Sequence, residues 1–298
     1  MKKGRNYLGL GVRYFCMLFV LATLLAGCEK PLAEDETPVE NHNVTLRFSL
    51  YELVPFSSAA PVSPTRAMQD VSQLCSRLNV AFFQNGEKVK TVTQKAGDDT
   101  YGTVGVTLPE GTYQVVAIAH SSDGSATIST TEKVTFPSNL VSDTFYYYGD
   151  LTVGSTPLDE QLTMTRAVAM FRLVLTSPLP AAITMLRFYY TGGSSTFSPL
   201  AGYGIVKSRQ TVLLDATEGR TVYEVYSFPH EETDVLKIQV AAYDADANVV
   251  YERTFENVPI TRDMVTVYTG SLTGESTGSG KLSLQAESDW AGYYNYEF

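Results

Sequence analysis

The stretch LNVAFFQNGEKVKTV, residues 78–92, decides the fold class of this chain. Asn85-Gly86 stands between two short runs that are rich in β-branched and aromatic residues. This dipeptide favours the tightest hairpin turn, because both central residues of that turn need a positive φ. The stretch therefore predicts two antiparallel strands joined by a two-residue turn.

The same strand pattern continues along most of the chain. VTLRFSL (44–50) alternates apolar and polar residues, and LTMTRAVAMFRLVL (162–175) is apolar on both faces, as in a central strand. Turn residues recur about every 8–12 residues, which is the spacing of antiparallel sandwiches. A helix is expected over Ala67–Arg77, where Val71 and Cys75 fall at helical spacing. The chain is otherwise predicted to be all-β.

Two antiparallel β-sandwich domains are expected, at residues 44–158 and 159–298. The boundary is placed near GSTPLDEQ (154–161), a Gly/Ser/Pro cluster after which the strand pattern starts again. One large sandwich is the alternative, since a single β domain can reach this length.

The amino-terminal stretch LATLLAGCEK (21–30) closes an apolar block, residues 14–26, that follows a basic start without acids. This order predicts a secretion signal, because a membrane-spanning helix needs about 20 apolar residues. Leu25-Ala26-Gly27-Cys28 resembles the bacterial lipobox, so cleavage between Gly27 and Cys28 and acylation of Cys28 are expected. A short anchor helix that stays attached is the alternative.

Residues 1–27 are thus the expected lipoprotein signal peptide, and residues 28–43 an acidic tether rich in Glu and Pro. Acyl chains on Cys28 would hold the mature protein on the outer membrane without spanning it, since two buried chains already anchor a protein stably. The early acids also resemble the surface-export tag of some Gram-negative lipoproteins, although acidic tethers are ordinary.

Charge argues against nucleic acid as a partner. The chain carries a formal charge of −10, and removal of residues 1–27, which hold four basic residues and no acid, makes it −14. Nucleic acid and anionic lipid both need a basic footprint. Cys16 leaves with the signal and Cys28 is acylated, so Cys75 is the one remaining free thiol and is expected to be buried and structural.

No catalytic group, metal site or cofactor is expected. The three histidines are His42, His120 and His230, and no nucleophile elbow accompanies them. The HSSD run at 120–123 is interpreted as a polar turn after a strand, and HEET at 230–233 lacks the second histidine of a zinc site. DADAN (244–248) imitates half of a calcium loop but is better explained as a hairpin turn.

Tyrosine is abundant, with 19 residues that include the run Tyr146-Tyr147-Tyr148. Exposed aromatic rings stack on sugars, so a glycan-binding surface lipoprotein is the rival hypothesis. Successive strand residues point to opposite faces, however, and each run should split between core and surface. Core or interface packing is therefore the favoured interpretation.

Several of these stretches, in their order along the chain, resemble the fimbrillin family of Gram-negative anaerobes, in particular its FimB-type fimbrial subunit and anchor lipoproteins of type V pili. The resemblance lies in SRLNVAFFQNGEKVKTV (76–92), LPEGTYQVVAIAH (108–120), MTRAVAMFRLVL (164–175), FYYTGGSSTFSPLAGYG (188–204) and the ending VPITRDMVTVYTGSLTG with DWAGYYNYEF. It implies two tandem transthyretin-like sandwiches and a structural role, not an enzyme, in building or anchoring a pilus. The implied partners are other fimbrial subunits, joined by donor-strand exchange, with a host or bacterial surface ligand as a further option.

The resemblance also singles out a protease site. In stalk members of the family a trypsin-like protease cuts after an arginine ahead of the first core hairpin, and Arg66, followed by Ala67, fits by position within SSAAPVSPTRAMQD (57–70). VTLRFSL is the candidate exchangeable strand, because it precedes this loop. A chain cut after Arg66 would be a fibre subunit without lipid, and an intact chain would be an anchor. The alternative is that Arg66 is an ordinary loop arginine that is not cut.

Overall fold

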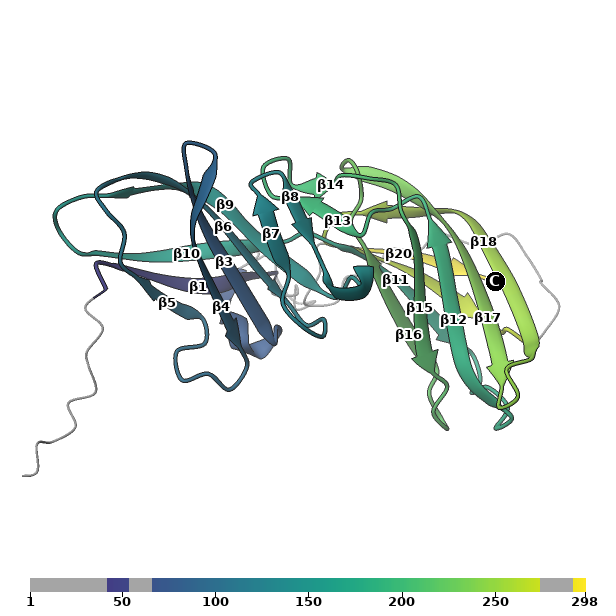
Figure 1. Ribbon diagram of the computed structural model, residues 1–298. Coiled ribbons are helices and arrows are strands. Elements are labelled where there is room, and N and C mark those ends of the chain that lie inside the picture. The colour runs from purple at the N-terminus through teal and green to yellow at the C-terminus, as the bar shows by residue number, and fades with distance from the viewer. Residues whose placement is uncertain (1–41, 54–65, 274–291) are drawn as a thin grey trace, which may run out of the picture. The chain divides into compact units, whose positions relative to one another are not determined.

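The computed structural model describes residues 42–53, 66–273 and 292–298. These residues form strands, which Figure 1 labels, and two short 3-10 turns. The all-β prediction is confirmed. The predicted helix over Ala67–Arg77 is wrong, since strand β2 (Arg66–Asp70) and the 3-10 turn η1 (Val71–Gln73) occupy that segment. The Asp70 side chain accepts a hydrogen bond from the Ser72 N–H and so caps the start of η1. The helical segment is limited to this one turn.

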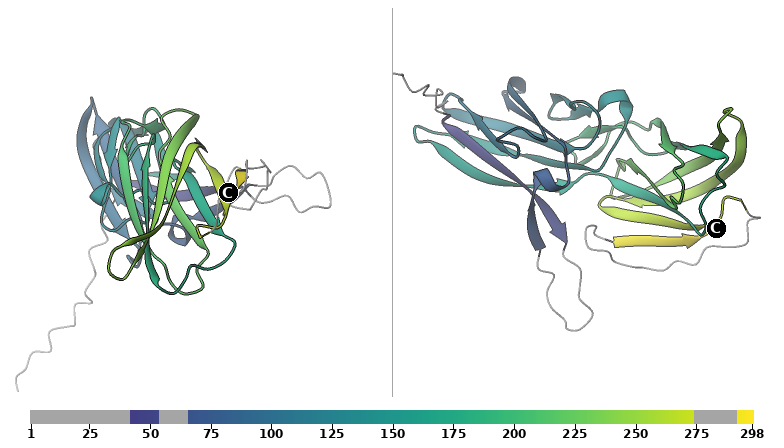
Figure 2. Two further views of the ribbon diagram at one scale, coloured as in Figure 1. Left: turned by 90° about the vertical axis from the view of Figure 1, so that its right-hand side faces the viewer. Right: turned by 90° about the horizontal axis from the view of Figure 1, so that it is seen from below.

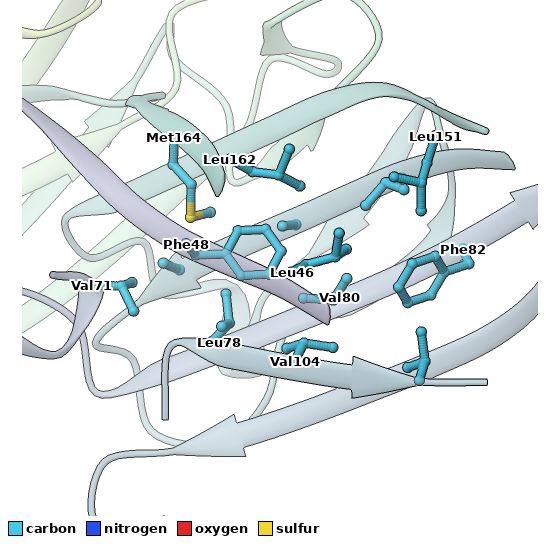
Figure 3. Close-up of a cluster of buried hydrophobic side chains, with 14 of the residues drawn as sticks. Leu46, Phe48, Val71, Leu78, Val80, Phe82, Val104, Leu151, Leu162 and Met164 are labelled. Carbon is cyan, nitrogen blue, oxygen red and sulfur yellow. The ribbon is translucent and has the colours of Figure 1, made fainter. Parts of the chain in front are cut away.

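The first sheet pair contains two layers. One layer holds β1 (Val44–Leu53), β2, β5 (Thr103–Val106) and β10 (Leu158–Arg166), and the other holds β3 (Arg77–Gln84), β4 (Glu87–Lys95), β6 (Gly111–His120) and β9 (Thr144–Val153). The end of β10 also pairs with β9, which joins the two layers at one corner. Apolar side chains from both layers form the first buried cluster, part of which is drawn in Figure 3.

The hairpin that opened the sequence analysis forms as predicted. Asn85 and Gly86 have φ values of 53° and 82°, and β3 and β4 pair antiparallel on either side of them. Among the described strands β4 pairs with β3 alone, and it presents a row of charged side chains, Glu87, Lys88 and Lys90. Charges of this kind protect a sheet edge from pairing with another chain.

The second sheet pair has four strands in each layer. One layer is ordered β16 (Val222–Ser227), β11 (Ala169–Leu175), β19 (Met264–Gly270) and β20 (Gly292–Glu297). The other is ordered β15 (Arg209–Asp215), β12 (Ile183–Thr191), β17 (Thr233–Asp244) and β18 (Val249–Thr261). Between them lies a second apolar cluster, in which the rings of Phe171 and Phe255 lie 5.7 Å apart.

A small sheet connects the two halves of the sequence. Strands β7 (Thr127–Thr130) and β8 (Lys133–Thr135) come from the chain between β6 and β9, whereas β13 (Thr196–Ser198) and β14 (Tyr203–Gly204) come from the chain between β12 and β15. Strand β8 pairs antiparallel with β13, and this pairing makes one sheet of the two hairpins. The small sheet, called the joining sheet below, was not predicted.

A third apolar cluster lies at the joining sheet. It contains Phe83 and Ile118 from the first sheet pair, Phe197 from the joining sheet, and Met170 and Val265 from the second sheet pair. The described part of the chain thus has a continuous apolar contact between its two halves.

The buried side chain of Arg166 adds a polar tie at the same place. Its Nε lies 2.8 Å from Oδ1 of Asp143, before β9, and its Nη1 lies 2.8 Å from Oδ1 of Asp263, in the turn between β18 and β19. Only 4% of the Arg166 side chain is exposed, and its guanidinium stands over the ring of Phe145. Burial raises the pKa of Asp263, although Arg166 acts against that rise.

Strand β10 begins at the residue where the sequence analysis placed the boundary between the two domains, 158/159. It pairs in parallel with β1, so residues 159–166, which the sequence analysis placed in the second domain, lie in a sheet of the first pair. The two-domain division stays a prediction. We propose a boundary near Ala167 and Val168, which separate β10 from β11.

Candidate assembly site

Strand β1, which contains VTLRFSL, has hydrogen-bonded neighbours on both edges. On one edge, Val44–Leu50 pair in parallel with Leu158–Met164 of β10. On the other edge, its first half pairs with β5 and its second half with β2. Figure 2 shows the end of β1 beside the start of β2.

The inward side of β1 is completely buried. Val44, Leu46, Phe48 and Leu50 have exposed fractions of 0%, 0%, 3% and 0%. Figure 3 shows Leu46 and Phe48 among side chains of the first buried cluster that come from other strands, such as Leu78, Val80 and Val104. The outward Arg47 forms an exposed ion pair with Asp159 of β10.

Loss of β1 would therefore leave a groove with an apolar floor and unpaired backbone groups along β10, β5 and β2. Burial of four such side chains stabilises by about 1.5–3 kcal/mol each, or about 6–12 kcal/mol together as an upper estimate. A strand of similar pattern from another chain could fill this groove, since backbone pairing and apolar burial are gained in the same step.

The predicted cleavage site lies next to β1. Arg66 is the first residue of β2 and pairs with Leu53, and Ala67 pairs with Glu52. The interpretation of Arg66 as a loop residue is therefore corrected, although the preceding stretch 54–65 lies outside the described residues. Cleavage between Arg66 and Ala67 would need only the end of a strand to open. Gly27, Cys28 and the tether as far as residue 41 also lie outside the described residues.

Cys75 and His120 are both buried in the first sheet pair. Cys75 is buried in the first cluster, and burial raises the pKa of its thiol, so the nucleophilic thiolate is disfavoured. His120 is fully buried, and burial lowers its pKa to about 4. Its Nδ1 accepts the Ser122 N–H, so a neutral ring carries its proton on Nε2, 3.2 Å from the Asn79 amide. We infer that Asn79 presents its amide oxygen there, because that oxygen otherwise has no partner.

The remaining candidate motifs are local turns. The hydroxyls of Ser121 and Ser122 donate to backbone carbonyls rather than to His120, as expected of a polar turn. In DADAN, Asp244 Oδ1 accepts the N–H groups of Asp246 and Asn248 between β17 and β18, which confirms the hairpin turn. Nδ1 of His230 lies 2.7 Å from Oδ2 of Asp234. Burial raises the pKa of the Asp234 carboxyl, but the hydrogen bond from His230 and two backbone hydrogen bonds outweigh burial and lower the pKa below its ordinary value.

The tyrosine run splits between two apolar clusters, whereas the sequence predicted a split between core and surface. Tyr147 packs on the first cluster, and Tyr146 and Tyr148 pack on the third. The ring of Tyr146 lies 4.8 Å from that of Phe197, and Gln114 donates to the Tyr148 hydroxyl. Every tyrosine whose side chain is described is buried or half-buried. The glycan-binding rival therefore lacks an open tyrosine platform in the described part of the chain.

The two sheet pairs and the joining sheet define an all-β protein of the β-sandwich class. The profile of the family described as "Fimbrillin-A associated anchor proteins Mfa1 and Mfa2" matches residues 34–297. The chain belongs to this family, whose members are structural proteins of the cell-surface fimbrium. The predicted resemblance to the fimbrillin family is thereby confirmed. Across the described residues, no helix is long and apolar enough to cross a bilayer.

Solved structures show distant similarity. A candidate adhesin from Bacteroides ovatus ATCC 8483 has 13% identity and a TM-score of 0.46, over 71% of this chain and 82% of that one. The fimbrial anchor protein Mfa2 from Porphyromonas gingivalis has 10% identity and a TM-score of 0.36, over 70% and 80%. The tip fimbrial protein Mfa3 from Porphyromonas gingivalis, with a C-terminal truncation, has 9% identity and a TM-score of 0.38, over 78% and 96%. No curated protein matches the chain.

Proposed function

We propose that this chain is a lipid-anchored fimbrial subunit or fimbrial anchor that joins other subunits by strand exchange. The family match, which spans both sheet pairs, supports the fimbrial role. The basic start, the apolar block and Leu25-Ala26-Gly27-Cys28 support acylation of Cys28 and attachment to the outer membrane.

The observation that carries strand exchange is the burial of β1 between two neighbours. Its apolar side chains lie in the first cluster, and it stands near the amino-terminal end of the described chain. Along the chain, the segment 54–65 is the covalent link between β1 and β2, and so between β1 and the rest of the fold. A cut at the start of β2 would free it from the covalent chain, so that a partner's strand could replace it.

The two forms of the proposal differ at the amino terminus. In a fibre subunit, cleavage after Arg66 removes residues 28–66 with the acyl chains, and the chain begins at Ala67. In an anchor, the chain begins at an acylated Cys28. Mass analysis of the amino terminus of protein isolated from cells distinguishes the two, and a chain that still begins at Met1 contradicts both.

A disulfide across β1 and β5 tests strand exchange directly. The register pairs Arg47 with Thr103, so Arg47→Cys with Thr103→Cys, in a Cys75→Ala background, should hold β1 in place. We expect this variant to be absent from sheared fimbriae under oxidising conditions and to return when a reductant is added. The matched control joins Arg77 and Lys95 of β3 and β4 in the same way and should assemble normally. Normal assembly of the locked Arg47/Thr103 variant would exclude exchange of β1.

A further inference from the structure

The joining sheet borders a pocket that strand exchange does not use. The pocket has a volume of about 450 Å³ and lies where β8, the turn η2 (Pro137–Asn139), β13 and the start of β15 meet. Its residues come from both halves of the sequence, because β8 and β13 pair there. A pocket of this size can hold one or two sugar rings, whereas a single inorganic anion would leave most of it empty.

The charge of the pocket is opposite to that of the protein. Lys133 and Arg209 line it, none of the described lining residues is acidic, and the whole chain has a formal charge of −10. Neither cation forms an ion pair within the described residues. Two unpaired cations in one concave site favour an anionic group on the ligand.

The other lining groups suit a sugar. Thr196 and Asn139 offer a hydroxyl and an amide for hydrogen bonds to ring hydroxyls. Ile205 and Val206 are 41% and 57% exposed at this pocket and supply apolar surface for the C–H face of a ring. An acidic peptide would also suit the two cations, but its carboxylate side chains offer no C–H ring face for Ile205 and Val206.

Hydrogen bonds with two serines, the buried Ser194 and the half-buried Ser208, hold the wall of the pocket in place. The hydroxyl of Ser194, which is fully buried, accepts the N–H groups of Thr196 and Val206. The hydroxyl of Ser208 accepts the Ser195 N–H and donates to the carbonyl of Val206. These bonds fix residues 205–208 against β13, so the lining groups are positioned before a ligand arrives and less ordering is needed on binding.

We propose that this pocket binds a carboxylate-bearing saccharide, with Lys133 and Arg209 on the carboxylate, Thr196 and Asn139 on ring hydroxyls, and Ile205 and Val206 against the ring. The proposal does not rest on the fimbrial role, because none of these residues belongs to β1 or its neighbours. It adds a ligand-binding activity to a structural subunit.

The test uses the full chain purified in detergent. It is screened against short oligosaccharides ending in galacturonate, glucuronate or N-acetylneuraminate, each paired with a neutral counterpart, and the tightest binder is titrated by calorimetry. We expect the protein to bind the acidic saccharide more tightly than its neutral counterpart, with an affinity that falls as salt is added. The variant Lys133→Met with Arg209→Met should lose at least tenfold in affinity. Thr196→Val should weaken binding several-fold. The variant Lys90→Met with Lys95→Met, an equal charge change on β4, should leave affinity unchanged.

Three results would overturn the proposal. One is no preference for any acidic saccharide over its neutral counterpart. Another is unchanged affinity in the double variant. A third is equal or tighter binding of hexaglutamate with the same dependence on Lys133 and Arg209, which would assign the pocket to acidic peptides. Incorporation of the double variant into sheared fimbriae should be normal, so failure here and failure of strand exchange are distinguishable.

Discussion

Strands β1 and β20 are both paired in parallel with a neighbour, yet they contribute very differently to their sheets. Strand β1 lies inside its layer, with neighbours on both edges and four inward side chains buried. Within the described residues, strand β20 lies at the edge of its layer and pairs with β19 alone, and its one buried side chain is that of Tyr293. The first sheet pair therefore depends on a strand near the amino terminus, whereas the second depends little on its last strand.

The strongest test of this comparison is Phe48→Ala against Tyr294→Ala. Phe48 fills the first cluster, so its truncation should lower the free energy of unfolding by about 3–5 kcal/mol. Tyr294 on β20 is half-buried, and its truncation should cost about 1 kcal/mol. Urea titration followed by circular dichroism measures both. Equal losses in the two variants would mean that β1 and β20 matter equally, and would also weaken the case for a groove under β1.

The substitution Arg166→Met tests whether the two sheet pairs unfold together. The substitution leaves the partly buried carboxylates of Asp143 and Asp263 without their shared cation, so it should cost about 2–3 kcal/mol. We expect one urea transition in the parent protein and two in the variant, because the polar tie between the halves is lost. Arg172→Met breaks the more exposed pair with Glu224 and serves as the control, with a cost of about 0.5–1 kcal/mol and no separation. A single transition in Arg166→Met would show that the apolar contact suffices.

Acid should destabilise the first sheet pair through His120. Its folded pKa of about 4 is below the ordinary value of 6.5, so the unfolded chain binds the proton more readily. The contribution of His120 is fully present above pH 6.5 and is lost as the pH falls towards 4, by about 3 kcal/mol. His120→Gln keeps a hydrogen-bonding group and should remove this part of the pH dependence. Parallel stability curves for parent and variant between pH 7 and 4 would show that His120 is not the titrating group.

The local features of this fold were predictable and the distant ones were not. Asn85-Gly86 and Asp244 each specify a turn within four residues, so their sequence alone predicts the hairpins that form. The wrong helix at Ala67–Arg77 has a clear cause. Apolar residues at helical spacing also fit a strand followed by one tight turn, and pairing with β1 decides in favour of the strand.

The joining sheet and the pocket beside it could not be read from the sequence. Strands β8 and β13 are three residues each and carry no strong pattern of their own, and their pairing joins segments about sixty residues apart. The Arg166 tie has the same origin, since Asp143 and Asp263 are distant from it along the chain.

The amino-acid sequence by itself determined the all-β class, the hairpin turns, the expected export signal with Cys28, and the strong negative charge, because each depends on composition or on neighbours within a few residues. Tertiary structure alone decided that β10 completes the first sheet pair, that β1 is enclosed on both edges, and that Lys133 and Arg209 share one pocket. These are pairings across long separations, and their free energy comes from apolar surface that is buried only when both partners are in place.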